Sequence, residues 1–194
     1  MRIMKKLVFA LMMIVGMTVS GQTDHMKFKG IPIDGTLTSF VNKLKQKGFT
    51  LQESGKGSAM LEGNFAAVKG CTVIVNEHES GVVNRVAVAF PTKDTWAMLY
   101  HDYSNLKDML TQKYGKPALV EEEFQNRSYD LDDNGKMHEV RMDRCRYVCD
   151  WALENGSIEL RIEHMTSTGG CMVFLVYIDA DNEAKVREKA LEDL

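Results

Sequence analysis

Two stretches of the chain repeat apolar residues at the spacing of an amphipathic helix. The first comprises Leu37, Phe40, Val41 and Leu44, and the second comprises Trp96, Leu99, Tyr103, Leu106 and Leu110. Residues at i, i+3, i+4 and i+7 share one helix face, so each stretch can bury a stripe against a core. With Gly48 and Gly115 as terminators, the pattern predicts helices over about 36–47 and 94–114.

Segments rich in β-branched and aromatic residues follow each helix. We expect strands at 49–53, 59–67, 71–77 and 82–90 after the first helix, and at 118–124, 143–153, 157–165 and 171–178 after the second. The same order, one helix and then four strands, occurs twice. The sequence therefore predicts an α+β fold built as a tandem helix-plus-antiparallel-sheet repeat, with the helices packed on one sheet face.

The two expected copies differ in length. Gly70 and the strand after it align with Gly156 at an offset of 86, whereas Gly48 and Gly115 are 67 residues apart. We assign the 19-residue difference to a hairpin or loop inserted over 124–143. The expected segments are a leader over 1–21, a first repeat over 22–92, a second repeat over 93–180 and a charged C-terminal helix over 181–194.

Asn155-Gly156 is a strong hairpin signal, because Asn-Gly favours the positive φ angles of a two-residue turn. With these residues as the loop, the expected partners on one face are Leu153 with Ile158, Trp151 with Leu160, Cys149 with Ile162 and Tyr147 with His164. The other face receives Ala152 with Glu159, Asp150 with Arg161 and Val148 with Glu163. One face is thus expected to be apolar and the other polar.

Candidate binding residues lie on the expected strands. Arg85, Ala87 and Ala89 occupy alternate positions, so one side of their strand is small and shallow. This pattern indicates either a concave sheet surface or close packing against a neighbouring element. The candidate partner-binding side chains are Arg85, Arg144, Arg146 and Arg161.

The first 21 residues have the pattern of a secretory signal peptide. Arg2, Lys5 and Lys6 precede an apolar run over 7–15, and small residues follow up to Gly21. The run is shorter than the ~20 residues of a membrane span, and the leader holds no cysteine that could be lipidated. We expect cleavage between Gly21 and Gln22 and a mature chain without a membrane span, in the periplasm or secreted.

Composition and charge narrow the classes of partner. The chain is 44% hydrophobic and 26% charged, as globular domains are. Its formal net charge of −3 becomes −6 when the three basic residues of the leader are removed. An acidic protein lacks the electrostatic basis for binding nucleic acid, so we expect no nucleic-acid partner. The same balance favours a basic partner.

Four cysteines, Cys71, Cys145, Cys149 and Cys171, would enter an oxidising compartment in which three pairings are open. Cys145 and Cys149 would be about 13 Å apart on one strand, beyond the reach of a disulfide, so we expect thiols there. The spacing of Cys145 and Cys149 with His138 or His164 is unlike that of the ligands of a zinc site. A dyad of Cys149 and His164 on one face stays an alternative to a structural histidine. We expect no cofactor.

A run of acidic and amide residues begins like a calcium loop. Asp130, Asp132 and Asn134 precede Gly135 in the order D-x-D-x-N-G, but position twelve is Arg141 instead of the usual Glu. A turn at the tip of a hairpin explains the same residues without an ion. We therefore expect no metal, with these three residues as the candidate calcium ligands.

Two segments that end helices carry a resemblance to a known fold. They are Lys47-Gly48-Phe49 and Lys113-Tyr114-Gly115-Lys116-Pro117, and with Phe28-Lys29-Gly30-Ile31-Pro32-Ile33-Asp34-Gly35-Thr36 and the doubled element order they resemble the beta-lactamase-inhibitor-protein-like fold. The chain is similar to small exported proteins of Bacteroidetes that share this architecture. The resemblance implies two sheets side by side, whose outer face and loops grip a protein. The cysteines and the insertion depart from that pattern.

These observations lead to one expectation of function and two alternatives. We expect an exported, non-enzymatic binding protein that uses its sheet face and loops to hold a protein or an envelope component. The first alternative is an exported hydrolase without a recognisable motif, since the sequence has no G-x-S-x-G elbow. The second is a calcium-stabilised structural module. A deep pocket with converging polar groups would favour the hydrolase.

Overall fold

The computed structural model of the protein describes residues 24–78, 80–125, 131–166 and 169–192. The expected leader over 1–21 and the calcium candidate Asp130 lie outside the described residues. Within the described part, no helix is long and apolar enough to cross a membrane.

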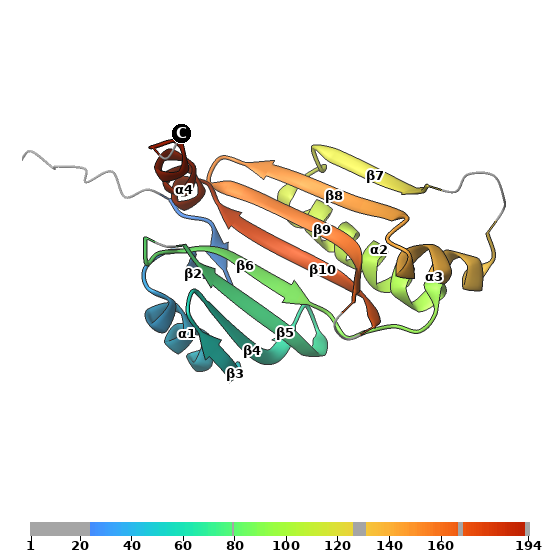
Figure 1. Cartoon of the computed structure of the whole chain (residues 1–194), viewed down its shortest axis with the longest axis horizontal. Helices are drawn as coiled ribbons and strands as arrows, with labels where there is room; N and C mark the ends of the chain where they lie inside the picture. Colours follow the sequence, from blue (N-terminus) through green and yellow to red (C-terminus); the bar gives the residue numbers. More distant parts are fainter. Residues whose placement is uncertain (1–23, 79, 126–130, 167–168, 193–194) are drawn as a thin grey trace, which may run out of the picture.

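An eight-stranded antiparallel sheet forms the centre of the fold (Figure 1), in the order β3-β4-β5-β6-β10-β9-β8-β7. Its strands are β3 (Thr50–Gly55), β4 (Ser58–Phe65), β5 (Val68–Glu77), β6 (Val83–Ala89), β7 (Leu119–Phe124), β8 (Cys145–Leu153), β9 (Gly156–Met165) and β10 (Gly170–Asp179). A small second sheet pairs β1 (Lys27–Phe28) with β2 (Ile31–Pro32). The antiparallel pairing of β6 with β10 joins the strands that follow the first helix to those that follow the second.

Four helices accompany the sheet: α1 (Leu37–Gln46), α2 (Trp96–Tyr114), α3 (Asp133–Arg141) and α4 (Ala180–Glu192). The hydroxyls of Thr36 and Thr95 cap α1 and α2 by accepting a hydrogen bond from an N–H of the first turn. The two helices predicted from apolar spacing, and the α+β class, are confirmed.

The core lies between the sheet and α1, α2 and α3. The stripes of α1 and α2 are buried against strand residues that point toward them, such as Val73 on β5 and Trp151 on β8. α1 contacts β3, β4 and β5, whereas α2 contacts β9 and β10. Three helices thus cover one face of the sheet, and we call the opposite side the open face. α4 differs from them, because its residues adjoin side chains of the open face.

The register of the β8–β9 hairpin differs from the prediction. The turn residues are Glu154 and Asn155, and Gly156 already pairs with Leu153. A Cβ at Gly156 would lie 2.1 Å from the carbonyl oxygen of Ile178 on β10. The glycine is therefore required by close approach of a neighbouring strand, and the hairpin does not use it as a turn residue. Every predicted pair shifts by two positions, which leaves each side chain on its predicted face.

The expected hairpin or loop over 124–143 is wrong for most of its described part, which forms α3. The carboxylate of Asp132 accepts a hydrogen bond from the N–H of Gly135, 2.7 Å away, and so caps the helix. Met137 and Val140 are buried one turn apart and hold α3 against the core. The Asp-Asn-Gly run that resembles a turn is the first turn of a helix, because this capping bond satisfies its backbone.

Candidate functional site

The open face is laid out in rows, because paired residues of successive strands point the same way. One row runs Glu53, Met60, Ile74, Ala87, Val176, Glu159, Asp150 and Leu119 from β3 to β7. The next runs Thr50, Glu62, Thr72, Ala89, Phe174, Arg161, Val148 and Glu121. A shorter one runs Met172, Glu163, with Arg146 and Glu123 paired beyond it on β8 and β7. In all three, an apolar residue on β10 is paired with a charged residue on β9.

Apolar or small residues of β4, β5, β6 and β10 adjoin on this face and form an apolar strip, with Glu62 and Arg85 at its sides. The strip comprises Met60, Thr72, Ile74, Ala87, Ala89, Met172, Phe174 and Val176. A hollow of about 450 Å³ is sunk into it beside Met60, Ala89 and Met172. A second hollow, of about 250 Å³, lies at its border and is lined by Ala87 and Val176 together with the polar side chains of Asn76, Arg85, Glu159 and Arg161. Ile74 lines both hollows. The small side chains of Ala87 and Ala89 leave this space, so the concave surface that the sequence offered as one of two alternatives is present.

Methionine is prominent in the larger hollow. Met60 and Met172 both line it, and Met60 is 38% exposed whereas Met172 is 5% exposed. Unbranched thioether side chains adapt their shape to a partner at little cost. The hollow can therefore accept apolar groups of different shapes.

The β7, β8 and β9 part of the open face is a charged half, which comprises Glu121, Glu123, Arg146, Asp150, Glu159, Arg161 and Glu163. Arg161 is its centre: its Nε donates to Glu163 at 2.8 Å and its Nη1 contacts Glu159. Its guanidinium also lies over the ring of Phe174, 4.7 Å from the centroid. An aromatic ring and two carboxylates thus surround one cation, at the border of the apolar strip.

Asp150 and Glu159 are a like-charged pair at this border. They face each other directly across β8 and β9, an arrangement that destabilises an antiparallel sheet. Partial burial raises the pKa of Asp150 above its ordinary value, and the charges of Glu159 and Glu121 raise it further, against the attraction of Arg161. Among the described residues, Arg161 is the one cation that counteracts this effect, so negative charge is in excess here.

The four predicted arginines do not form one site. Arg85 and Arg161 both line the smaller hollow, and Arg85 lies 3.6 Å from Glu183 of α4. Arg146 is on the same face, paired with Glu121. Arg144 lies apart in the turn between α3 and β8, where it makes two hydrogen bonds, of 2.8 and 3.0 Å, to the buried carboxylate of Glu139.

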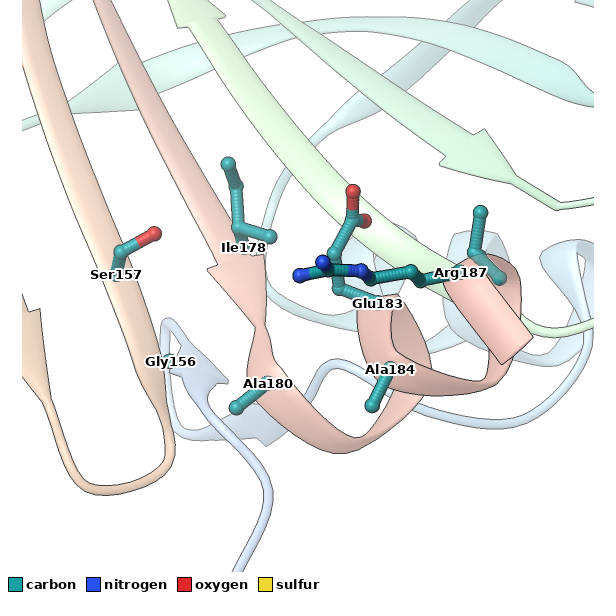
Figure 2. A pocket seen from close by; sticks show the side chains of 8 residues that line it. Gly156, Ser157, Ile178, Ala180, Glu183, Ala184 and Arg187 are labelled. Carbon is teal, nitrogen blue, oxygen red and sulfur yellow. The ribbon is translucent and has the colours of Figure 1, made fainter. Parts of the chain in front are cut away.

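Beyond the strip, α4 lies at one end of the open face and borders a third, open hollow of about 690 Å³ (Figure 2). Ile178 on β10 and Ser157 on β9 form its floor, and Arg187 extends from α4 toward Ile178 (Figure 2). Glu183 accepts a hydrogen bond of 2.9 Å from the amide of Asn84 on β6. These contacts place α4 over the sheet.

The cysteines are free thiols in this structure, and Cys71, Cys149 and Cys171 are buried. Cys149 shares a hydrogen bond of 3.1 Å with the hydroxyl of Tyr103 and pairs with Leu160, four residues from His164. Four strand residues span about 13 Å, so the alternative of a Cys149–His164 dyad is wrong. Burial raises the pKa of Cys149, against the opposing effect of the Tyr103 bond.

The candidate calcium residues that are described serve α3. Asp132 caps the helix, Asp133 accepts a hydrogen bond of 3.0 Å from the N–H of Ala97, and Asn134 lies within the helix. The structure thus does not bring them together as a calcium loop. Among the described residues, no group of three or more His, Cys, Asp or Glu side chains could hold a metal ion.

Sequence reasoning missed the residues that distinguish the open face. The predicted register paired Asp150 with Arg161 as opposite charges, whereas the structure pairs it with Glu159. Phe174 and Met172 went unnoticed because their strand is apolar on both faces. The pairing of β10 with both β6 and β9 would have revealed them, but it depends on long-range contacts.

Comparison with known proteins identifies no relative of this chain. No family model matches the chain, and neither the curated proteins nor the solved structures contain a significant match. The resemblance to the beta-lactamase-inhibitor-protein-like fold therefore stays a proposal.

Proposed function

We propose that this protein is an exported, non-enzymatic binding protein that holds a protein or an envelope component on the open face of its sheet. One observation carries the proposal: a hollow lined mainly by apolar side chains, with exposed Met60 at its edge, lies beside a charged half on the same sheet face. An apolar hollow with a charged border is typical of interaction sites.

The breadth of the face supports a macromolecular partner. Eight strands at a spacing of about 4.8 Å make the face roughly 34 Å wide. With about 20 Å along each strand, its area is of the order of 700 Å², close to the ~800 Å² that one partner contributes to a standard protein interface. Carboxylates of the same face already hold Arg146 and Arg161 in ion pairs, so the positions of these two side chains are fixed before a partner binds.

Two further parts of the proposal concern origin and architecture. The sequence pattern of residues 1–21 supports export to the periplasm or beyond the cell. The order of one helix and four strands, once around α1 and once around α2, supports a tandem repeat of the beta-lactamase-inhibitor-protein-like kind. The short α3 would then be the addition to the second copy.

Photocrosslinking in cells of the source organism tests the proposal. A benzoylphenylalanine would replace Thr72, which lines the larger hollow, and in a matched control it would replace Gln112, which is exposed on α2. We expect a discrete adduct from position 72 that position 112 does not give. Equal labelling at the two positions, or none, would refute a binding role for the open face.

A further inference from the structure

We infer that the partner of the open face is a cationic polypeptide segment, which places an apolar side chain in the larger hollow of the apolar strip and a basic side chain against Asp150 and Glu159. This inference rests on the proposed function and specifies the class of partner. It is argued from charge complementarity and from the spacing between the apolar and acidic groups.

The charge of the open face is strongly negative. Its strand positions carry seven carboxylates and three arginines, which are Glu53, Glu62, Glu121, Glu123, Asp150, Glu159 and Glu163 against Arg85, Arg146 and Arg161. The excess is greatest where Asp150 opposes Glu159, with only Arg161 close by. A basic side chain placed there would relieve the repulsion, so a cation gains more at this point than at an isolated carboxylate.

Arg161 shows the chemistry that this region accepts. Its guanidinium stacks on Phe174 and is held by Glu159 and Glu163, so an aromatic face and two carboxylates already bind a cation within the chain. Asp150 lies beside this group, and among the described residues no cation forms an ion pair with its carboxylate. A guanidinium or ammonium from a partner would complete the arrangement on the β8 side.

Distances along the row identify the partner as a polypeptide. Ile74, which lines the larger hollow, is followed along its row by Ala87, Val176 and Glu159 on successive strands. Three strand spacings, about 14 Å, separate Ile74 from Glu159, and an extended peptide covers that distance in about four residues. An apolar residue followed three or four positions later by Lys or Arg can therefore contact both groups while crossing the strands.

Other classes of ligand suit the face less well. An anionic membrane surface would be repelled by the seven carboxylates. A polyamine has the charge but no apolar group for the hollow of about 450 Å³. A neutral glycan would leave the repulsion between Asp150 and Glu159 unrelieved.

Binding of synthetic peptides to the protein, purified after expression of the full-length sequence, tests the inference. The first peptide is fluorescent and about twelve residues long, and each of its leucines is followed three positions later by a lysine. The second has glutamate for lysine, and the third has serine for leucine. We expect saturable binding of the first peptide that weakens steeply with added salt, and at least about tenfold weaker binding of the other two.

Variants of the protein locate the contact. The double variant Asp150→Asn with Glu159→Gln should bind the first peptide about tenfold more weakly, because two acceptor charges are lost. The control, Asp108→Asn with Glu154→Gln, removes the same charge from positions off the open face and should bind as the parent does. Met60→Ser, at a partly exposed position, should weaken the leucine-containing peptide and leave the serine-containing peptide unchanged.

Three outcomes would overturn the inference. They are no binding of the lysine peptide, equal binding of the lysine and glutamate peptides, and an equal loss in the Asp150/Glu159 variant and its control. The crosslinking experiment at position 72 distinguishes a failure of this inference from a failure of the proposed function. If the crosslinked segment carries no net positive charge, the cationic partner is refuted and the binding face stands; if no adduct forms, both proposals fall.

Discussion

Asp150 and Glu159 place two carboxylates directly across a strand pair, where opposite charges or an apolar pair would stabilise the sheet. A stable fold keeps such a pair when it serves something other than stability. Because Asp150 is partly buried beside Glu159 and Glu121, its negative charge is unfavourable in the folded state. A function of the open face that needs Asp150 would therefore lower the stability of the fold at this residue.

We expect Asp150→Asn to stabilise the protein by about 0.2–1 kcal/mol at neutral pH, the range for a cross-strand pair. The pKa of Asp150 is raised above 3.8 in the folded state, so the native chain keeps this proton in a pH range where the unfolded chain has lost it. Its destabilising effect thus sets in as pH rises through that range. Urea unfolding between pH 4 and 8 would show the gain; no gain over Asp108→Asn at neutral pH would contradict it.

Gly156 marks a second position where one atom decides stability. A Cβ there would meet the carbonyl oxygen of Ile178, which belongs to backbone and cannot move aside. We expect Gly156→Ala to lower the free energy of unfolding by about 3 kcal/mol. Gly55→Ala, in an exposed edge strand with open space around it, should change it by less than about 0.5 kcal/mol. Equal effects in chemical denaturation would contradict the hairpin register.

The thiols are predicted to be inert in the folded protein. Burial raises the pKa values of Cys71, Cys149 and Cys171, and it raises the pKa of Cys145 to about 12. Thiolate is the reactive form, so a disulfide reagent at pH 8 should react slowly with the native chain. In guanidinium it should titrate all four thiols. Two fewer would indicate a disulfide and contradict the free thiols of the structure.

At the scale of elements, α4 is joined to the N-terminal part of the chain by buried polar groups. The carboxylate of Asp179 accepts hydrogen bonds from the N–H groups of Met26 and Asn182, at 2.8 and 2.9 Å. The amide of Asn182 donates to the carbonyls of Ile33 and Val83, at 3.0 and 3.1 Å. The start of α4, the small sheet and β6 therefore depend on one buried side chain.

We expect Asn182→Ala to loosen α4 and residues 26–33 together, because it leaves two buried carbonyls without their donor. The cost should be about 1–3 kcal/mol. Hydrogen exchange read by mass spectrometry should show faster exchange in both segments and little change in α2. Glu188→Ala, at an exposed position farther along α4, is the control. Faster exchange in α4 alone would contradict the shared anchor.

At the scale of the whole molecule, the two sides of one sheet differ in what covers them. Three helices cover the core side, and the open face carries the hollows beside its carboxylates. The export that we propose would supply the setting in which such a face meets its partner. We expect the protein recovered from its source to begin at Gln22, which intact-mass spectrometry would show. An unprocessed chain recovered with Met1 would contradict export.

The sequence by itself determined the elements whose signals are local. Apolar spacing placed α1 and α2, and strand alternation separated the core side of β8 and β9 from the open side even though the turn was misplaced by one residue. That separation survives because a shift of two positions preserves the face of every side chain. Local signals gave a wrong prediction at Asp132, because an aspartate that caps a helix has the same local sequence pattern as an aspartate in a turn.

Only the tertiary structure decided which residues meet across strands. The like-charged pair of Asp150 and Glu159, the stacking of Arg161 on Phe174 and the junction of β6 with β10 all follow from long-range pairing. The approach of β10 to Gly156 fixes the hairpin register, and no neighbour in sequence reports it. The sequence thus determined the face on which each residue lies, because that depends on local periodicity. The partners on that face were decided by contacts between distant strands.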